Sequence, residues 1–272
     1  MKIIPVTSLE MSDPVLEPYR TLKTPERVNR QHQFVVQGDK SIQRLLLSPC
    51  QVVSILCSPR FLEKISPWLN DRHEETAVIL GETSDIQQVI GYRMYQEVMA
   101  VARIPGSPTI DEVMMTSPRP WLFVALDGLT NAENTGTIIR NCSGFGVSGL
   151  ISGETSSDPY LRRSVRCTMG TIFNIPIIRP SSLAGTLKIL KKHGVHIIGT
   201  FPHSETVVLS RAGMAGDCCL VFGAEGDGVS DSVSELCDQS VCIPMHRGTD
   251  SLNVAAASAV FLYEANRQRG LA

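Results

Sequence analysis

The sequence predicts an α/β protein of two domains. Short apolar runs rich in Val, Ile and Leu recur along the 272 residues, and amphipathic segments separate most of them. Strands that alternate with helices favour a largely parallel sheet with helices on both faces. Prolines at 105, 108, 118 and 120 interrupt this pattern, and each restricts itself and the preceding residue to extended shapes. We therefore predict domains at 1–108 and 121–272, joined by a linker at 109–120.

The first domain begins with a polar, partly helical lead-in over residues 1 to about 30. Apolar runs then predict strands at 32–38, 51–57, 76–80 and 95–104, and amphipathic spacing predicts helices at 39–47, 61–69 and 83–91. This half of the chain contains no phosphate-binding loop and no group of residues of catalytic type. It is expected to be a compact α/β domain.

The second domain starts with residues 121–126, which are apolar throughout and typical of a strand buried on both faces. Further strands are expected at 147–152, 175–178, 195–201, 218–222 and 240–245. Helices are expected at 135–144, at 158–169 and at 182–193, and a short one is expected after Ser230, which caps it. Asn134 begins the first of these helices. A last, alanine-rich helix follows, with Asp250 or Ser251 as its cap.

The composition restricts the classes of function. Against 27 Asp and Glu stand 25 Lys and Arg, giving a net charge of −2, which argues against a protein that coats nucleic acid indiscriminately. No apolar run approaches the roughly 20 residues of a membrane span, and the start lacks a signal-peptide core. The eight cysteines show no C-x-x-C pair and are expected as buried residues in a reducing compartment. We therefore expect a cytoplasmic protein without a membrane partner.

Three polar or glycine-rich loops follow predicted strands, around Asn134, around Glu225 and around Ser251 and Asn253. Open α/β sheets bind ligands at the carboxyl ends of their strands, and glycine lets a ligand approach the backbone closely. These loops indicate a nucleotide-like cofactor. Each is also compatible with an ordinary turn and a helix cap, and for Asn134 and Ser251 that alternative stays open.

Several common chemistries lack their motifs. The dinucleotide G-x-G-x-x-G, the phosphate loop G-x-x-x-x-G-K-[ST] and the hydrolase G-x-S-x-G are all absent. His246, Asp250 and Ser251 are close in sequence, but adjacency does not make a triad. A metal site would have to use Cys218, Cys219, Cys237 and His246, whose spacing is wrong for zinc, so no metal is expected.

Four motifs together carry a family resemblance. They are Asn134-x-Gly136-x-x-x-Arg140, Arg166-Cys-Thr-Met-Gly170, Gly223-x-Glu225-Gly226-x-Gly228, and Ile243-Pro-Met with Ser251-Leu-Asn253. In order and spacing they resemble the signature of the SpoU (TrmH-like) RNA ribose 2′-O-methyltransferases of the SPOUT superfamily, over residues 121–268. The first half resembles the ribosomal-protein-like RNA-binding domain often found ahead of it. Ala224, Gln37 and Glu97 depart from common family residues, which bears on substrate choice more than on activity.

The resemblance implies a SPOUT-type parallel sheet with a C-terminal trefoil knot, S-adenosylmethionine as cofactor, and a homodimer with the active site near its interface. It implies transfer of a methyl group to a ribose 2′-hydroxyl, in ribosomal RNA rather than transfer RNA. The alternatives are a tRNA 2′-O-methyltransferase, a base N-methyltransferase of the same superfamily, and a catalytically inactive RNA-binding protein.

The resemblance also assigns roles to residues. Arg140 is the central catalytic residue; because a guanidinium stays protonated, it is expected to bind a phosphate and stabilise the developing alkoxide. Asn134 and Glu225 would orient Arg140, with Ser251 and Asn253 completing the network. Backbone groups of Thr200, Gly223, Ile243, Met245 and Leu252 would hold the cofactor. Candidate RNA contacts are Arg162, Arg163 and Arg166, with Arg27 and Arg30 near the start, although such charges also occur on solvated helix faces.

Overall fold

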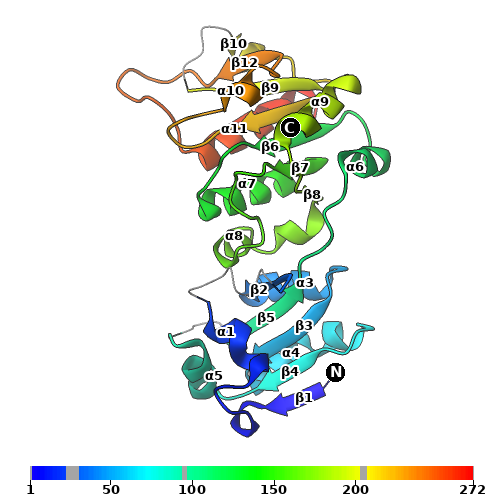
Figure 1. The fold of residues 1–272 in the computed structure, drawn as a ribbon, viewed down its shortest axis with the longest axis vertical. Helices are drawn as coiled ribbons and strands as arrows, with labels where there is room; N and C mark the ends of the chain where they lie inside the picture. Colours follow the sequence, from blue (N-terminus) through cyan, green and yellow to red (C-terminus); the bar gives the residue numbers. More distant parts are fainter. Residues whose placement is uncertain (1, 23–30, 94–96, 203–206, 272) are drawn as a thin grey trace. The chain divides into compact units, whose positions relative to one another are not determined.

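The chain folds into two compact units in the computed structural model, which describes residues 2–22, 31–93, 97–202 and 207–271. Unit 1 consists of Met1–Gly106 together with Tyr160–Phe173, and unit 2 consists of Ser107–Pro159 and Asn174–Ala272. Figure 1 labels most of their elements, which are numbered in chain order. Two features differ from the predicted domains: residues 109–120 belong to unit 2, and a segment from the middle of the chain belongs to unit 1.

Unit 1 is built on a five-stranded sheet in the order β1-β4-β3-β5-β2. Strand β5 runs antiparallel to both of its neighbours, and the remaining pairs are parallel. Its strands are β1 (Lys2–Pro5), β2 (Gln33–Gln37), β3 (Val52–Cys57), β4 (Ala77–Leu80) and β5 (Val98–Arg103). Its helices are α1 (Glu17–Arg20), α3 (Asp39–Leu46), α4 (Pro59–Asn70), α5 (Thr83–Ile90) and α8 (Arg162–Cys167).

The segment Tyr160–Phe173 packs against β2 of unit 1. The ring of Phe34, which is fully buried, lies 5.1 Å from the Tyr160 ring and 6.2 Å from the Phe173 ring, centroid to centroid. Arg44 also donates a 2.8 Å hydrogen bond to the carbonyl of Met169. The helix predicted at 158–169 is therefore too long, since α8 covers only six residues. It begins at Arg162, because Leu161 has extended backbone (φ −61°, ψ 138°).

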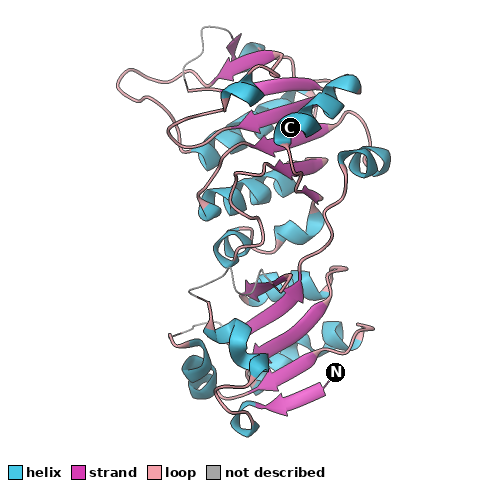
Figure 2. Ribbon diagram, in the orientation of Figure 1, coloured by secondary structure: helices cyan, strands magenta, loops and turns pink. Residues whose placement is uncertain are grey.

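Unit 2 is built on a seven-stranded sheet in the order β10-β12-β9-β11-β6-β7-β8, drawn as magenta arrows in Figure 2. Every paired neighbour is parallel, which confirms the predicted α/β class with a parallel sheet. The strands are β6 (Leu122–Leu126), β7 (Gly149–Ser152), β8 (Ile177–Ile178), β9 (His196–Thr200), β10 (Val207–Val208), β11 (Cys218–Phe222) and β12 (Gln239–Cys242).

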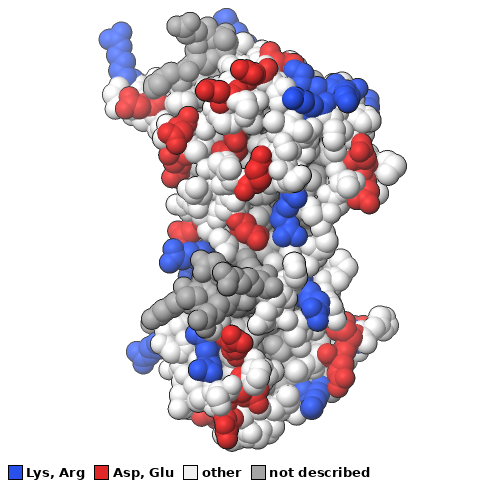
Figure 3. All heavy atoms as spheres, viewed as in Figure 1, with Lys and Arg blue, Asp and Glu red and all other residues white. Residues whose placement is uncertain are grey.

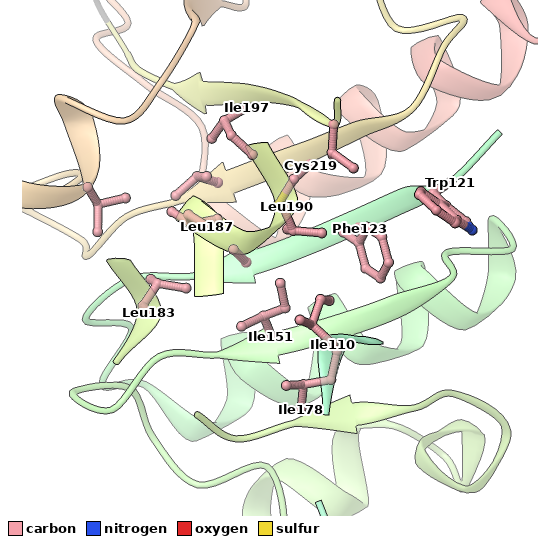
Figure 4. Close-up of a cluster of buried hydrophobic side chains, with 14 of the residues drawn as sticks. Ile110, Trp121, Phe123, Ile151, Ile178, Leu183, Leu187, Leu190, Ile197 and Cys219 are labelled. Atoms are coloured by element: carbon pink, nitrogen blue, oxygen red, sulfur yellow. The ribbon is translucent and has the colours of Figure 1, made fainter. Parts of the chain in front are cut away.

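Helices cover both faces of this sheet. On one face α6 (Ile110–Thr116), α9 (Leu183–Lys192) and α10 (Asp231–Ser234) pack on alternate strand residues such as Phe123 and Ile197. Figure 4 shows Leu183, Leu187 and Leu190 of α9 directed into this core. On the other face lie α7 (Ala132–Gly144) and α11 (Val254–Gln268). There the rings of Phe222 and Phe261 meet edge to face at 5.7 Å. Because successive side chains of a strand point to opposite faces of the sheet, each face has its own core.

The predicted linker at 109–120 is wrong, because α6 occupies most of it. Thr109 and Glu112 form a capping box at its start, and Ile110, Val113 and Met114 are buried at helical spacing. The prolines lie outside the helix, at 105, 108, 118 and 120, and so do not interrupt it.

Other elements also differ from prediction. Helix α7 begins at Ala132 with Asn131 as its cap, not at Asn134, and α11 is capped by Asn253, not by Asp250 or Ser251. Strand β12 ends at Cys242, ahead of Pro244, since proline cannot donate to a sheet ladder. Strand β1 was expected to be part of a polar lead-in. Of the strand predicted at 95–104, residues 95 and 96 lie outside the described residues.

Candidate active site

A pocket lies at the carboxyl ends of three neighbouring parallel strands, β9, β11 and β12. These three strands and β6 adjoin in the sheet, so the loops that follow them meet at one edge. The pocket has a volume of about 370 Å³, within the range of small-molecule sites. It is lined by Thr200, Phe201, Pro202, Phe222, Gly223, Ala224, Glu225, Gly226, Gly228, Ile243, Met245, Ser251, Leu252, Asn253, Val254, Ala257 and Phe261.

The loop after β11, residues 223–228, forms one wall of the pocket. Ala224 and Gly228 exchange two backbone hydrogen bonds, of 2.8 and 3.0 Å. These hydrogen bonds bring the two ends of the loop so close to each other that a Cβ added to Gly223 would lie 2.1 Å from the carbonyl carbon of Gly228. Gly226 and Gly228 adopt φ values of 113° and 73°, which favour glycine. The glycines therefore set the shape of this wall.

A network of three polar side chains joins the three loops around Asn134, Glu225 and Asn253. Asn134 and Asn253 both donate from their amide nitrogens to Oε1 of Glu225, the latter at 3.2 Å. The amide of Asn253 also lies 3.2 Å from Oδ1 of Asn134. These residues are separated by 91 and 28 positions along the chain. The sequence prediction that the three loops meet is thus matched for these side chains.

The helices that carry this network are fixed to one another. Asn131 caps α7 by accepting from the N–H groups of Glu133 and Asn134, and Oδ1 of Asn253 accepts from Ala255 at 2.9 Å to cap α11. Further along α7, the amide of Asn141 donates to α11, to the carbonyl of Ala255 and to Oγ of Ser258, both at 2.9 Å. Capping and cross-bonding therefore hold both helix starts beside the pocket.

Arg140 lies outside this arrangement. It is exposed on α7, about 9 Å further along the helix axis than Asn134 and about 120° around it. Among the described residues none forms a hydrogen bond or ion pair with its guanidinium, and it does not line the pocket. The predicted orientation of Arg140 by Asn134 and Glu225 is therefore not found within a single chain.

The other predicted site residues lie in the pocket wall. The five predicted cofactor contacts, Thr200, Gly223, Ile243, Met245 and Leu252, all line the pocket. Ser251 also lines it but makes no side-chain hydrogen bond to the described residues, so it does not complete the polar network as predicted.

The sequence reasoning missed the aromatic part of the wall. Phe201 and Phe222 lie at the ends of β9 and β11, and Phe261 projects from α11. Phe201 directly follows the predicted contact Thr200, and Phe222 directly precedes Gly223. Their position at strand ends was a signal that could have identified them. They give the pocket apolar surfaces that suit a planar base.

The charge of the pocket favours a cationic ligand. Glu225 is the one charged side chain among the described residues that line it. A carboxylate in a partly apolar pocket favours a positive group over a neutral or negative one. A nucleoside bearing a sulfonium fits this combination of an aromatic wall, glycine backbone and a single negative charge.

The candidate RNA contacts differ in their surroundings. Arg162 is half-buried and donates to Oε1 of Gln37 at 3.2 Å, within unit 1. Arg163 and Arg166 are exposed, whereas Arg27 and Arg30 lie outside the described residues. On the face shown in Figure 3, positive and negative side chains are interspersed over both units.

The alternative sites that were considered from the sequence can be compared with the described residues. In the described part of the chain, no group of three or more His, Cys, Asp or Glu residues could hold a metal ion. His246 contacts the carbonyl of Arg247 at 3.1 Å, and no hydrogen bond links it to Asp250 or Ser251 within the described residues. None of the described helices has the length and apolarity to cross a membrane.

The chain is similar to known methyltransferases. Residues 121–263 match the model of the SpoU rRNA Methylase family. An uncharacterised tRNA/rRNA methyltransferase of Mycobacterium tuberculosis is 31% identical over 94% of this chain and 89% of its own length. The 23S rRNA (guanosine-2′-O-)-methyltransferase RlmB of Shewanella oneidensis is 28% identical over 87% of this chain and 98% of its own. Among solved structures, the SpoU methyltransferase AviRb of Streptomyces viridochromogenes, in complex with AdoMet, superposes with a TM-score of 0.82 at 26% identity, covering 96% and 100% of the two chains.

Proposed function

Because this chain belongs to the SpoU rRNA methylase family, we propose that it transfers a methyl group from S-adenosylmethionine to a ribose 2′-hydroxyl in ribosomal RNA. The observation that carries the proposal is the pocket where Glu225 joins Asn134 and Asn253. It combines one carboxylate with aromatic and glycine surfaces. The RlmB relative is named as a 23S rRNA (guanosine-2′-O-)-methyltransferase, and the structure of AviRb was solved in complex with AdoMet. Both findings support the same reaction class for this chain.

The pocket residues are proposed to hold S-adenosylmethionine. Backbone groups of Thr200, Gly223, Ile243, Met245 and Leu252 would bind it, and Phe222 would contact its base. When bound, the cofactor would supply an electrophilic methyl group, which would pass from sulfur to the ribose oxygen while the hydroxyl proton passes to water, leaving S-adenosylhomocysteine. The chain's own contribution is to orient the donor and to stabilise the charge that develops on the ribose oxygen.

Arg140 is proposed to supply that stabilisation from a second copy of the chain. Within one chain its guanidinium is exposed and does not line the pocket. We therefore propose that it acts on the pocket of the second copy. Helix α11, which is bonded to α7, exposes 39% of Val260 and 53% of Tyr263. We infer a homodimer in which such apolar side chains are covered and Arg140 reaches the partner's pocket, where it binds a phosphate beside the target ribose.

Three further properties follow from the family resemblance and are part of this proposal. Residues towards the C-terminus would form a trefoil knot around the pocket. Unit 1 would bind the RNA substrate, and the proposed phosphate contacts are Arg162, Arg163, Arg166, Arg27 and Arg30. The chain would act in the cytoplasm, where its eight free cysteines would stay reduced.

The reaction is tested by mapping methyl groups on total RNA from cells with and without the gene. Nuclease digestion and mass spectrometry should show one ribose methyl group that depends on the gene and lies in ribosomal RNA. A methyl group that stays on the free base would instead indicate base methylation. Calorimetric titration of the purified chain with S-adenosylmethionine should show binding, and its absence would favour an inactive RNA-binding protein.

Arg140→Ala should leave the dissociation constant of S-adenosylmethionine nearly unchanged and slow methyl transfer by at least about 100-fold, as expected for the loss of one preorganised electrostatic group. Transfer measured with tritiated cofactor provides the test. Mixing Arg140→Ala chains with Gly223→Ala chains, each impaired alone at a low cofactor concentration, should restore part of the activity if Arg140 acts on the partner's pocket. Undiminished transfer by Arg140→Ala would contradict the assigned role, and a mixture no more active than its separate components would contradict its action across the dimer.

A further inference from the structure

Asp127 holds both ends of the loop that forms the pocket wall. It directly follows β6 and is buried, with 7% of its surface exposed. Its backbone N–H donates to the carbonyl of Phe222, the last residue of β11, at 2.9 Å. Its carboxylate oxygen Oδ2 accepts from the N–H of Ser230 at 2.7 Å. Because residues 223–229 lie between these two contacts, one residue fixes where this loop begins and where it ends.

The loop between these contacts carries the parts of the pocket that depend on position. Gly223 and Gly228 approach each other at its base, and both line the pocket. Glu225 lies between them and accepts hydrogen bonds from Asn134 and Asn253. A shift at the base of the loop would therefore move both the backbone surface and the single carboxylate of the pocket.

Burial of a carboxylate needs a compensating interaction. An ionised group that leaves water costs free energy unless strong hydrogen bonds replace its hydration. The contact with Ser230 is of the strong kind, because a charged acceptor shortens and strengthens a hydrogen bond. An apolar side chain at this position would avoid the cost of burial but could not hold Ser230.

We propose that Asp127 is a positioning residue for methyl transfer, which holds residues 223–229 in the conformation that binds S-adenosylmethionine. The inference rests on the proposed use of that cofactor. Asp127 does not line the pocket and acts through Gly223, Glu225 and Gly228. Its loss should therefore weaken cofactor binding by more than the accompanying loss of stability explains.

Glu154 offers a matched control. It lies just beyond the end of the neighbouring strand β7, and its Oε2 accepts from the N–H of Leu183 at 2.8 Å. Like Asp127 it is a carboxylate that binds a backbone N–H at the start of a helix, although it is exposed. That helix is α9, and its start, unlike Ser230, does not adjoin a loop that lines the pocket. Glu154→Ala therefore removes the same kind of bond without touching residues 223–229.

The test compares calorimetric dissociation constants for S-adenosylmethionine with thermal unfolding temperatures. Both Asp127→Ala and Glu154→Ala should lower the unfolding temperature, whereas only Asp127→Ala should weaken cofactor binding, by about tenfold for the loss of a charged hydrogen bond. In transfer assays Asp127→Ala should raise KM for the cofactor and approach the wild-type kcat at saturation. Equal weakening by the two variants would overturn the proposal, because it would show a general effect of stability.

Two further variants separate position from charge and guard against misfolding of the alanine variant. Asp127→Asn keeps an oxygen acceptor of the same shape and should bind the cofactor nearly as the wild type does. Ser230→Pro removes the donor N–H at a φ of −63°, which suits proline, and should weaken binding as Asp127→Ala does. Wild-type binding by Ser230→Pro, or an Asp127→Asn as weak as Asp127→Ala, would overturn the positional role. Titration of the wild type alone tests the proposed function.

Discussion

Asn253 illustrates how a single side chain can serve both folding and chemistry. Its oxygen caps α11 through Ala255, and its nitrogen donates to Glu225 and Asn134. Asn253→Asp separates the two roles, because aspartate caps helices as well as asparagine does but cannot donate. We expect an unfolding free energy within about 1 kcal/mol of the wild type, and methyl transfer at least about tenfold slower, because the new carboxylate would face Glu225.

Asn266→Asp is the matched control for this change. Asn266 belongs to the same helix and donates at 3.1 Å to the carbonyl of Phe145, at the end of α11 remote from its cap. It introduces the same charge without contact to the pocket. Transfer by Asn266→Asp should stay close to that of the wild type. If both variants lost the same activity, the effect of Asn253→Asp would be one of net charge.

Gly223 is the position where a single methyl group should do most damage to the pocket. A Cβ there would lie 2.1 and 2.3 Å from the carbonyl carbon and oxygen of Gly228, so Gly223→Ala must open the loop. We expect calorimetry to show at least about tenfold weaker binding of S-adenosylmethionine, as the paired contacts of the loop are lost. Gly213→Ala, where a Cβ meets nothing within 4 Å, should bind normally. Normal binding by Gly223→Ala would show that the loop does not form the cofactor wall.

Single residues were predictable where a motif surrounded them. The residues predicted from the motifs to hold the cofactor do line one pocket, and Asn134, Glu225 and Asn253 do meet. Asp127 was not singled out, because an aspartate after a strand has no pattern of its own and its partner Ser230 is 103 residues away. The separation of Arg140 from the pocket was also invisible, since the motif fixes its spacing along a helix but not the direction it faces.

At the scale of the element, three side chains near the C-terminal end of α11, those of Glu264, Arg267 and Gln268, are joined by hydrogen bonds. Arg267 donates to both oxygens of Glu264 at 2.7 Å, and Gln268 donates at 2.8 Å. These hydrogen bonds, that of Arg267 first, lower the pKa of Glu264 from its ordinary 4.5 to about 2. Since the folded chain holds the lower pKa, Glu264 stabilises it fully above about pH 4.5, and this stabilisation is lost as the pH falls towards 2.

Glu264→Gln should therefore lose stability relative to the wild type at neutral pH, and the difference should shrink between pH 4.5 and 2. Urea unfolding at several pH values measures it. Arg267→Gln removes the strongest donor and should flatten the same part of the pH profile. A difference between Glu264→Gln and the wild type that stayed constant with pH would contradict the assigned pKa shift.

Elements were predictable when their own residues specified them. The central strands β6 and β11 are apolar runs buried on both faces, and the structure has them where expected. Helix α6 was missed because its flanking prolines were given more weight than the capping box of Thr109 and Glu112. Strand β1 has four residues, of which three are exposed, so its identity comes from pairing with β4 and not from an apolar pattern.

At the scale of the whole molecule, unit 1 depends on residues that follow much later in the chain. Phe34 is buried under Tyr160 and Phe173, which a fragment of residues 1–106 would lack. We expect this fragment to be less stable than unit 1 in the full chain by at least about 3 kcal/mol, a typical cost of losing large buried aromatic contacts. The measurement is urea unfolding of the fragment and of the full chain, in which the spectrum of the backbone amides reports the folded fraction at each urea concentration.

A fragment in which residues 160–173 follow 1–106 through a glycine–serine linker is the control, and it should recover most of the lost stability. If residues 1–106 alone unfolded cooperatively at the same urea concentration as the linked fragment, the segment would be a passenger and not part of the unit.

The whole-molecule organisation was predictable only in outline. Alternating strands and helices indicated a parallel sheet, and the structure has one. The order β10-β12-β9-β11-β6-β7-β8 was not predictable, since pairing in a parallel sheet joins strands that are distant in sequence and similar in composition. The assignment of Tyr160–Phe173 to unit 1 was hidden for the same reason. The arginines of α8 indicated RNA contacts or a solvated helix face, and the packing of Phe34 depends on a contact across more than a hundred residues.

This segment has a consequence for how such a protein could be recombined. The backbone passes from one unit to the other three times, near 106, 159 and 173, so the two halves are not separate cassettes in the gene. If the first hundred codons were exchanged for those of a relative, residues 160–173 would still come from this chain. They would then have to pack on the relative's residue at position 34. A chimera with altered RNA choice should therefore also carry the donor's codons for 160–173.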